Sequence, residues 1–157
     1  MKKVQWKVYA FWIALSELVG LAAGLLTRQG TEIYNLTAIK PPLSPPGWLF
    51  PVVWTILYAL MGISAARIWL GENTCDKKRS INLFIAQLAV NFFWPLFFFN
   101  LQAYGFSLIW LILLWVLVFL LILNNRKTDM LSSWLLIPYQ LWLSFALYLN
   151  VGVYLLN

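Results

Sequence analysis

Aromatic and polar side chains recur on one face of three apolar stretches of this chain. At helical spacing the residues that share a face are Trp54, Tyr58, Met61 and Ala65, then Gln87, Asn91, Trp94 and Phe98, then Tyr139, Trp142, Ala146 and Asn150. Tryptophan and tyrosine combine a flat apolar body with a polar edge, which suits a large planar ligand held by stacking and a few hydrogen bonds. An aromatic-rich core is the alternative, and spacing alone leaves both open.

The amides of Gln87 and Asn91 indicate the direction of the second face. An amide without a partner in hydrocarbon costs free energy, so this face should point into a helix bundle, where the aromatic residues line the interior. Four tryptophans lie near the ends of the apolar stretches, and we expect them to belong to the aromatic belt at the membrane–water interface. These are Trp6, Trp12, Trp69 and Trp134.

The chain offers few residues for metal or acid–base chemistry. It has no histidine and one cysteine, Cys75, so the common axial haem ligands are missing and no metal site is expected. We also find no nucleophile with a base beside it in the sequence, and expect no required cofactor. A free-base ring held by stacking fits this composition better than a ligated haem.

The composition indicates a membrane protein, so these faces should lie on membrane-spanning helices. The chain is 62% hydrophobic and 10% charged, with a mean hydropathy of +0.79. A helix needs about 20 mostly apolar residues to cross a bilayer. The charge-poor runs predict five spans, near residues 8–26, 47–69, 81–101, 104–124 and 133–155, with Arg67 snorkelling to the interface. We expect an all-α integral membrane protein, one domain over residues 1–157, with a structured loop between the first two helices.

The distribution of lysine and arginine predicts the orientation. One set of segments holds Lys2, Lys3, Lys7, Arg67, Lys77, Lys78, Arg79, Arg126 and Lys127, and the other holds only Arg28 and Lys40. The positive-inside rule then places the N-terminus in the cytoplasm and the C-terminus outside the cell membrane. Topology and attraction to the lipid bilayer explain the net charge of +6, so no nucleic-acid partner is expected.

Four of the seven prolines lie in the segment KPPLSPPGW at residues 40–48, directly before the second span. Proline fixes φ and restricts the residue before it, so this segment is stiff and extended. On the predicted topology it covers the outer mouth of the bundle as a lid. Two further prolines, Pro95 and Pro138, fall inside or near the start of their helices, where each removes a backbone hydrogen bond and can kink the helix. Simple tolerance of proline, which is common in membrane helices, is the alternative.

The first span carries the chain's one mid-membrane carboxylate. Glu17 shares a helix face with Ile13, Gly20 and Gly24, so we expect this face to pack on protein through its glycines. Glu17 is then either a hydrogen-bonded packing residue or a functional carboxylate, and the sequence does not fix its protonation. One acid without any histidine does not support proton transport.

These segments resemble the TspO/translocator protein family, also called tryptophan-rich sensory proteins or peripheral-type benzodiazepine receptors, in its bacterial form. The resemblance covers nearly the whole chain. It rests on KPP and PPGW within residues 40–48, PVVWTILYALMG at 51–62, NFFWP at 91–95 with Phe97 and Phe98, and LIPY at 136–139 with Trp142, Phe145, Ala146, Leu149 and Asn150.

The resemblance implies a five-helix bundle, usually a homodimer, that binds porphyrins such as protoporphyrin IX in a pocket under the first loop. The matching positions and the aromatic faces together give the expected ligand-binding residues: Trp48, Trp54, Tyr58, Asn91, Trp94, Phe98, Tyr139, Trp142 and Ala146. The sterol motif proposed for mitochondrial relatives needs a basic residue after the last-span tyrosine. No residue after Asp129 is charged, so a sterol is not expected as the native ligand.

Three functions follow from the resemblance. The first is a receptor or sensor that binds a porphyrin-like tetrapyrrole. The second is a light-dependent porphyrin-degrading enzyme, in which Trp54 and Trp142 match tryptophans implicated in some bacterial relatives and would be the catalytic residues. The third is a tetrapyrrole transporter, for which Glu17 and the helix kinks give little support.

Overall fold

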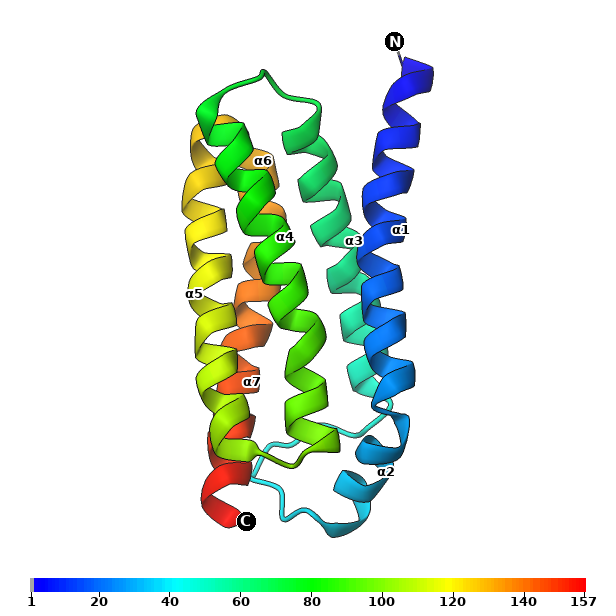
Figure 1. The fold of residues 1–157 in the computed structure, drawn as a ribbon, viewed down its shortest axis with the longest axis vertical. Coiled ribbons are helices and arrows are strands. Elements are labelled where there is room, and N and C mark those ends of the chain that lie inside the picture. The colour runs from blue at the N-terminus through cyan, green and yellow to red at the C-terminus, as the bar shows by residue number, and fades with distance from the viewer. Residues whose placement is uncertain (1) are drawn as a thin grey trace.

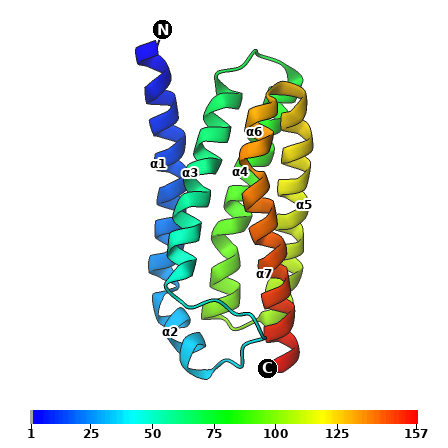
Figure 2. The same ribbon diagram turned by 180° about the vertical axis from the view of Figure 1, so that it is seen from behind.

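The computed structural model describes residues 2–157, with side chains from residue 5 onward. The side chains of Lys2 and Lys3, which contributed to the predicted orientation, lie outside the described residues. The long helices run side by side as an upright bundle (Figure 1, Figure 2), and their bounds are α1 Lys2–Leu26, α3 Leu49–Trp69, α4 Cys75–Pro95, α5 Tyr104–Thr128 and α7 Ile137–Leu156. Three shorter elements complete the described chain: α2 Arg28–Thr37, the π-helical turn η1 Leu96–Asn100, and α6 Met130–Leu135.

Five helical stretches within the described residues are long and apolar enough to cross a membrane. They are Gln5–Leu26, Leu49–Trp69, Cys75–Asn100, Tyr104–Thr128 and Met130–Leu156. The predicted five-helix membrane bundle is therefore confirmed. Helix α1 packs chiefly on α3, α4 packs on α5, and α5 also packs on α7, while α6 lies against α3 and α5.

Glycines bring α1 and α3 close together. A Cβ added at Gly62 would overlap the backbone of Ile13, and one added at Gly20 would overlap the ring of Tyr58. A Cβ at Gly24 would meet nothing within 4 Å. The prediction that the glycine face of the first span packs on protein is thus confirmed for Gly20. It is wrong for Gly24, which is exposed.

Both helix-interior prolines mark interruptions, as predicted. Pro95 is the last residue of α4, and the backbone continues as the π-helical turn, with the Leu101 amide donating to the Leu96 carbonyl at 3.1 Å. Pro138 is near the start of α7, just after the break at Leu136 that separates α6 from α7. The third and fifth spans are therefore each interrupted beside a proline.

The first connection contains a helix, α2, that the sequence analysis did not identify. Gly30 of α2 lies so close to the backbone of Phe99 that a Cβ there would overlap it, and the Asn100 amide donates to the Leu26 carbonyl at 2.9 Å. Helix α2 is thereby held beneath the α4–α5 connection.

The proline-rich segment then crosses one end of the bundle to reach the C-terminus, as the cyan trace at the bottom of Figure 1 shows. Pro41 is buried and packs where Gly152 leaves space for it. The Tyr148 hydroxyl donates to the Pro42 carbonyl at 2.6 Å, and the Ile39 amide donates to Asn157 Oδ1 at 3.0 Å. We call this end, with α2, residues 38–48 and the C-terminus, the loop end.

The opposite end, which carries the N-terminus and the α3–α4 connection, is the basic end (Figure 1). Every described lysine and arginine except Arg28 and Lys40 belongs to the segments there. This distribution follows the predicted pattern, and the assignment of the basic end to the cytoplasm stays a prediction.

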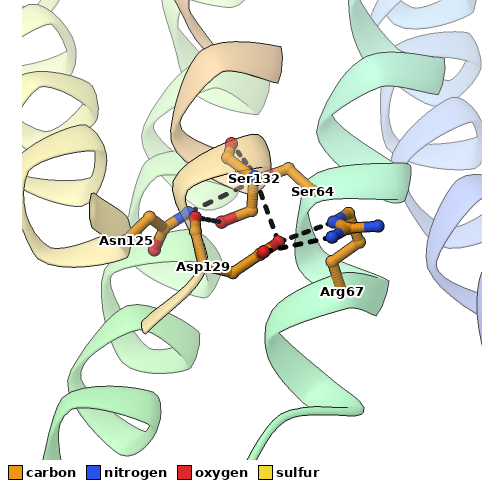
Figure 3. Close-up of polar contacts among 5 residues, drawn as sticks. All are labelled: Ser64, Arg67, Asn125, Asp129 and Ser132. Atoms are coloured by element: carbon orange, nitrogen blue, oxygen red, sulfur yellow. Dashed lines mark hydrogen bonds and ion pairs between the residues drawn. The ribbon is translucent and has the colours of Figure 1, made fainter. Parts of the chain in front are cut away.

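A polar cluster joins three helices at the basic end (Figure 3). Arg67, which was predicted to snorkel from the end of its span, binds Asp129 with two nitrogens, Nε to Oδ2 at 2.6 Å and Nη2 to Oδ1 at 3.1 Å. Asp129 also caps α6 by accepting from the Ser132 amide at 3.1 Å. The Ser64 hydroxyl donates to the Ser132 carbonyl at 2.8 Å. These contacts connect α3 with the α5–α6 turn.

The structure also corrects the prediction for Trp12. It was assigned to the interfacial belt, but it is only 5% exposed and packs edge-on to Phe84 of α4, with ring centroids 5.6 Å apart. Trp6 and Trp134 are 60% and 63% exposed, in agreement with a belt position. A tryptophan near a span end can thus be core when neighbouring helices reach it.

The close α1–α3 contact predicts that alanine substitutions at two glycines have different effects on stability. Gly62→Ala should lower the free energy of unfolding by about 1–3 kcal/mol, because the added methyl group must displace the backbone of Ile13. Gly24→Ala, the matched control in open space, should leave it unchanged or raise it by up to about 1 kcal/mol. Thermal unfolding in detergent measures both, and equal effects would contradict the contact.

The Arg67–Asp129 pair predicts a graded loss of stability. Asp129→Ala removes both the ion pair and the α6 cap and should lower the free energy of unfolding by about 2 kcal/mol. Asp129→Asn keeps a capping side chain and should cost about half as much, since the pair is partly exposed to water. Unfolding in detergent by chemical denaturant measures both variants.

The pH dependence checks that the pair is responsible. The hydrogen bonds from Arg67 lower the pKa of Asp129 below its usual 3.8. A carboxylate with a lowered pKa stabilises the folded protein at neutral pH, and this contribution is lost as the pH falls through the lowered pKa. The difference between wild type and Asp129→Asn should therefore shrink in acid. A difference that grows in acid would contradict the assignment.

Candidate functional site

A hydrogen-bonded chain crosses the middle of the bundle and joins α3, α4 and α7. The Tyr58 hydroxyl donates to Asn91 Oδ1 at 3.0 Å, the Asn91 amide donates to the Tyr139 hydroxyl oxygen at 2.6 Å, and the Tyr139 hydroxyl donates to Gln87 Oε1 at 2.8 Å. All four side chains are buried. We call these residues, Tyr58, Gln87, Asn91 and Tyr139, the deep polar cluster.

The deep polar cluster bears out the predicted direction of the α4 face, because both amides point into the bundle. Gln87 is fully buried and was placed on this face, though not among the expected ligand-binding residues. Its Nε2 also approaches Met61 Sδ at 3.9 Å. Its place one helical turn before Asn91 is the signal that could have included it.

Toward the loop end, Asn150 gathers a second set of polar contacts. Its Oδ1 accepts from Trp94 Nε1 and from the Ser107 hydroxyl, each at 3.2 Å, and its Nδ2 donates to the Tyr104 carbonyl at 3.0 Å. Phe98 is buried and stacks on Trp94, with centroids 5.0 Å apart. Trp94 and Phe98 are thus brought together as predicted by their spacing, and Asn150 holds the indole.

Trp54 lies directly against the deep polar cluster. Its ring is half-buried, with its centroid 5.5 Å from that of Tyr58 and 6.1 Å from that of Tyr139. This contact places one aromatic face of α3 beside two phenols that come from different helices. Trp54 is therefore the predicted tryptophan that packs on the deep polar cluster.

Trp142 forms part of a different surface, a groove of about 500 Å³ between α3 and α7. Its ring lies 5.8 Å from that of Phe50 and 5.6 Å from that of Phe145. The groove is lined by Val53, Ile56, Leu57, Leu60, Pro138, Leu141, Trp142 and Phe145. Sequence reasoning missed this wall except for Trp142, although Leu141 and Phe145 follow one another at helical spacing.

The remaining predicted residues differ in their surroundings. Ala146 is buried on α7. Trp48, at the start of α3, is 68% exposed, so the structure does not bring it into contact with the deep polar cluster. Glu17 is half-buried on the α1 face that packs on α3, between Ile13 and Gly20.

The arrangement favours non-covalent binding of a flat apolar molecule. It offers half-buried aromatic faces, an apolar groove and a line of neutral hydrogen-bonding groups. Among residues 5–157, no three histidine, cysteine, aspartate or glutamate side chains lie close enough together to hold a metal ion. Stacking, burial and a few hydrogen bonds are therefore the chemistry that these side chains supply.

Known proteins with similar sequences span almost the whole chain. A tryptophan-rich protein TspO of Chlorobaculum tepidum is 40% identical over 152 residues, which is 94% of each chain. The translocator protein of Bos taurus is 31% identical over 138 residues, 87% of this chain and 82% of its own. A tryptophan-rich sensory protein of Cereibacter sphaeroides is 31% identical over 134 residues, 85% of this chain and 82% of its own.

A sequence profile of the TspO/MBR family matches residues 12–156. This range includes most of the first span, the other four spans, the proline-rich segment and every residue of the deep polar cluster. It confirms the family resemblance found in the motifs of the sequence. The chain belongs to the TspO/MBR family.

Proposed function

We propose that this integral membrane protein is a receptor or sensor that binds a porphyrin-like tetrapyrrole ring. The ring would stack on the aromatic faces of α3, α4 and α7, beneath the segment of residues 38–48 at the loop end. The observation that carries the proposal is that Trp54, Trp94 and Trp142 are each half-buried on three different helices, with Trp54 packed on the buried deep polar cluster.

This burial pattern favours a binding site over a simple core. Tryptophans that serve only packing tend to be covered, as Trp12 is at 5% exposure. Trp54, Trp94 and Trp142 keep part of their ring faces accessible while their neighbours Tyr58 and Tyr139 are closed off. A planar ligand can cover these faces without opening the apolar core beneath them.

The groove between α3 and α7 supports the size and polarity of the ligand. Its volume of about 500 Å³ lies in the range of small-molecule sites, roughly 300–1,000 Å³. Its walls are apolar, and Trp142 and Phe145 supply aromatic edges. A flat hydrophobic ring dissolved in the bilayer can therefore reach Trp142 laterally, between two helices.

One further observation favours a sensory role, and another supports the orientation in the membrane. One relative bears the name tryptophan-rich sensory protein. The described basic residues gather at one end of the bundle, which supports the orientation with that end in the cytoplasm and the covered loop end outside.

Titration with protoporphyrin IX tests the proposal. Trp54→Ala with Trp142→Ala should weaken binding roughly tenfold or more, because each lost aromatic face contributes on the order of 1 kcal/mol beyond its buried area. Absorbance of the ring measures affinity independently of tryptophan content. The matched control is Trp6→Ala with Trp134→Ala, which removes two exposed tryptophans and should leave affinity unchanged.

Equal affinity in wild type and the Trp54/Trp142 variant would contradict the site. Because two alanines in the membrane can disturb folding, Trp54→Phe and Trp142→Phe serve as a second pair. These keep an apolar ring and should weaken binding only severalfold. Circular dichroism and thermal unfolding establish that each variant is folded before titration.

The enzyme alternative is favoured by one contact. Trp54 lies beside two tyrosines, Tyr58 and Tyr139. In this reaction the light-excited ring would lose electrons to dioxygen, which is the oxidant and is reduced, and the Trp54 indole would relay an electron between the two. If the bound ring is degraded, illumination in air should yield a new absorbing product. Trp54→Phe or Trp142→Phe should abolish the product while the ring still binds. The same product rate in both variants would exclude the tryptophans as catalytic residues.

A further inference from the structure

A second hollow, shallow and open to its surroundings, has a volume of about 560 Å³ and lies along one face of α4 at the basic end, opposite to the proposed ring site. It is lined by Cys75, Lys78, Arg79, Asn82, Leu83 and Ala86. These residues recur at intervals of three and four and so share one face of the helix. We call this hollow the α4 groove.

The α4 groove changes in polarity along the helix axis. Its cationic residues, Lys78 and Arg79, lie in the first turns of α4, Asn82 follows, and Leu83 and Ala86 complete the wall. The distance from Lys78 to Ala86 along the helix is about 12 Å, at 1.5 Å per residue. Charge, amide and hydrocarbon therefore follow one another in the order in which a phospholipid presents headgroup, ester and acyl chain.

The two cations of the groove are available to a ligand, in contrast to their neighbour Lys77. Lys77 Nζ donates to the Gly71 carbonyl at 3.1 Å and to Asn73 Oδ1 at 3.0 Å, and it lies 5.4 Å from the Trp69 ring centroid. The Lys78 side chain forms no hydrogen bond or ion pair with the part of the chain that the structure describes, while its backbone amide donates to the Thr74 carbonyl within the helix.

Arg79 has one charged neighbour, and that contact is weak. Its Nη1 lies 3.9 Å from Asp76 Oδ1, and the two side chains are 62% and 42% exposed. An exposed pair at this distance contributes little free energy. The Arg79 guanidinium therefore keeps most of its hydrogen-bonding capacity, and Lys78 adds a second cation within one helical turn.

We propose that the α4 groove binds one anionic phospholipid. Its phosphate contacts Lys78 and Arg79, and its acyl chain lies along Leu83 and Ala86. Charge complementarity selects an anionic headgroup. The apolar lower half of the groove selects a lipid over a soluble phosphate, because a free anion leaves Leu83 and Ala86 uncovered.

Cys75 gives a direct readout of occupancy. It is the one cysteine of the chain, it is exposed, and it lines the groove. The full chain is placed in nanodiscs of phosphatidylcholine alone or of equal parts phosphatidylcholine and phosphatidylglycerol, and the rate of Cys75 labelling by N-ethylmaleimide is measured. Bound phosphatidylglycerol should slow labelling roughly tenfold, since two nearby cations favour an anionic lipid by at least that factor.

Two double variants separate a site from general surface attraction. Lys78→Gln with Arg79→Gln should reduce the slowing to less than about twofold. Arg126→Gln with Lys127→Gln removes the same charge from exposed residues at the same end of the bundle, outside the groove, and should keep the full slowing. For each variant the slowing is the labelling rate in phosphatidylcholine discs divided by the rate in the mixed discs, so a change in the intrinsic reactivity of the thiol cancels.

Several outcomes would overturn the proposal. One is no slowing by phosphatidylglycerol in the wild type, and another is equal loss of slowing in both double variants, which indicates only a charged surface. A third is slowing by inorganic phosphate in phosphatidylcholine discs, which indicates a free-anion site. Native mass spectrometry gives an independent measure: phosphatidylglycerol adducts should fall roughly tenfold in the Lys78/Arg79 variant alone.

Discussion

The hydrogen-bonded chain from Tyr58 through Asn91 and Tyr139 to Gln87 sets how three helices face one another. Hydrocarbon offers no water to these groups, so each amide and phenol must find its partner inside the protein. Turning α4 by one residue would swing its two amides about 100° away from α3 and α7. The same requirement that pairs the polar groups therefore fixes the rotation of the helices, and with it the direction in which Trp54 faces.

The constraint is repeated at two other levels of the bundle. Near the loop end, Asn150 accepts from Trp94 and Ser107. Near the basic end, the Ser80 hydroxyl donates to Asn125 Oδ1 at 2.6 Å and accepts from the Asn124 amide at 2.7 Å. Aliphatic side chains between these levels can pack at several offsets, whereas a directed hydrogen bond tolerates few. Three polar levels therefore determine the register of α4 against α5 and α7.

The sequence predicted what local periodicity controls and missed what distant contacts decide. The span count follows from apolar length, and the inward direction of Asn91 follows from the cost of an unpaired amide. Helix α2 is polar and is held where Gly30 meets Phe99, nearly seventy residues away in the chain, so no local pattern predicts it. Arg67 at a span end could equally reach the interface or an acid, and only the fold brings Asp129 within 2.6 Å.

The deep polar cluster also bears on how a bound ring could be sensed. Both tyrosine hydroxyl protons are already donated, that of Tyr58 to Asn91 and that of Tyr139 to Gln87. A ligand that only stacks on Trp54 or Trp142 leaves these bonds intact and gains affinity from burial. A ligand that accepts a hydrogen bond from either phenol must break a bond between helices. On the proposed function, ligand polarity therefore decides whether binding merely fills an aromatic surface or also changes the packing of α3, α4 and α7, and only the second event can be transmitted along the bundle.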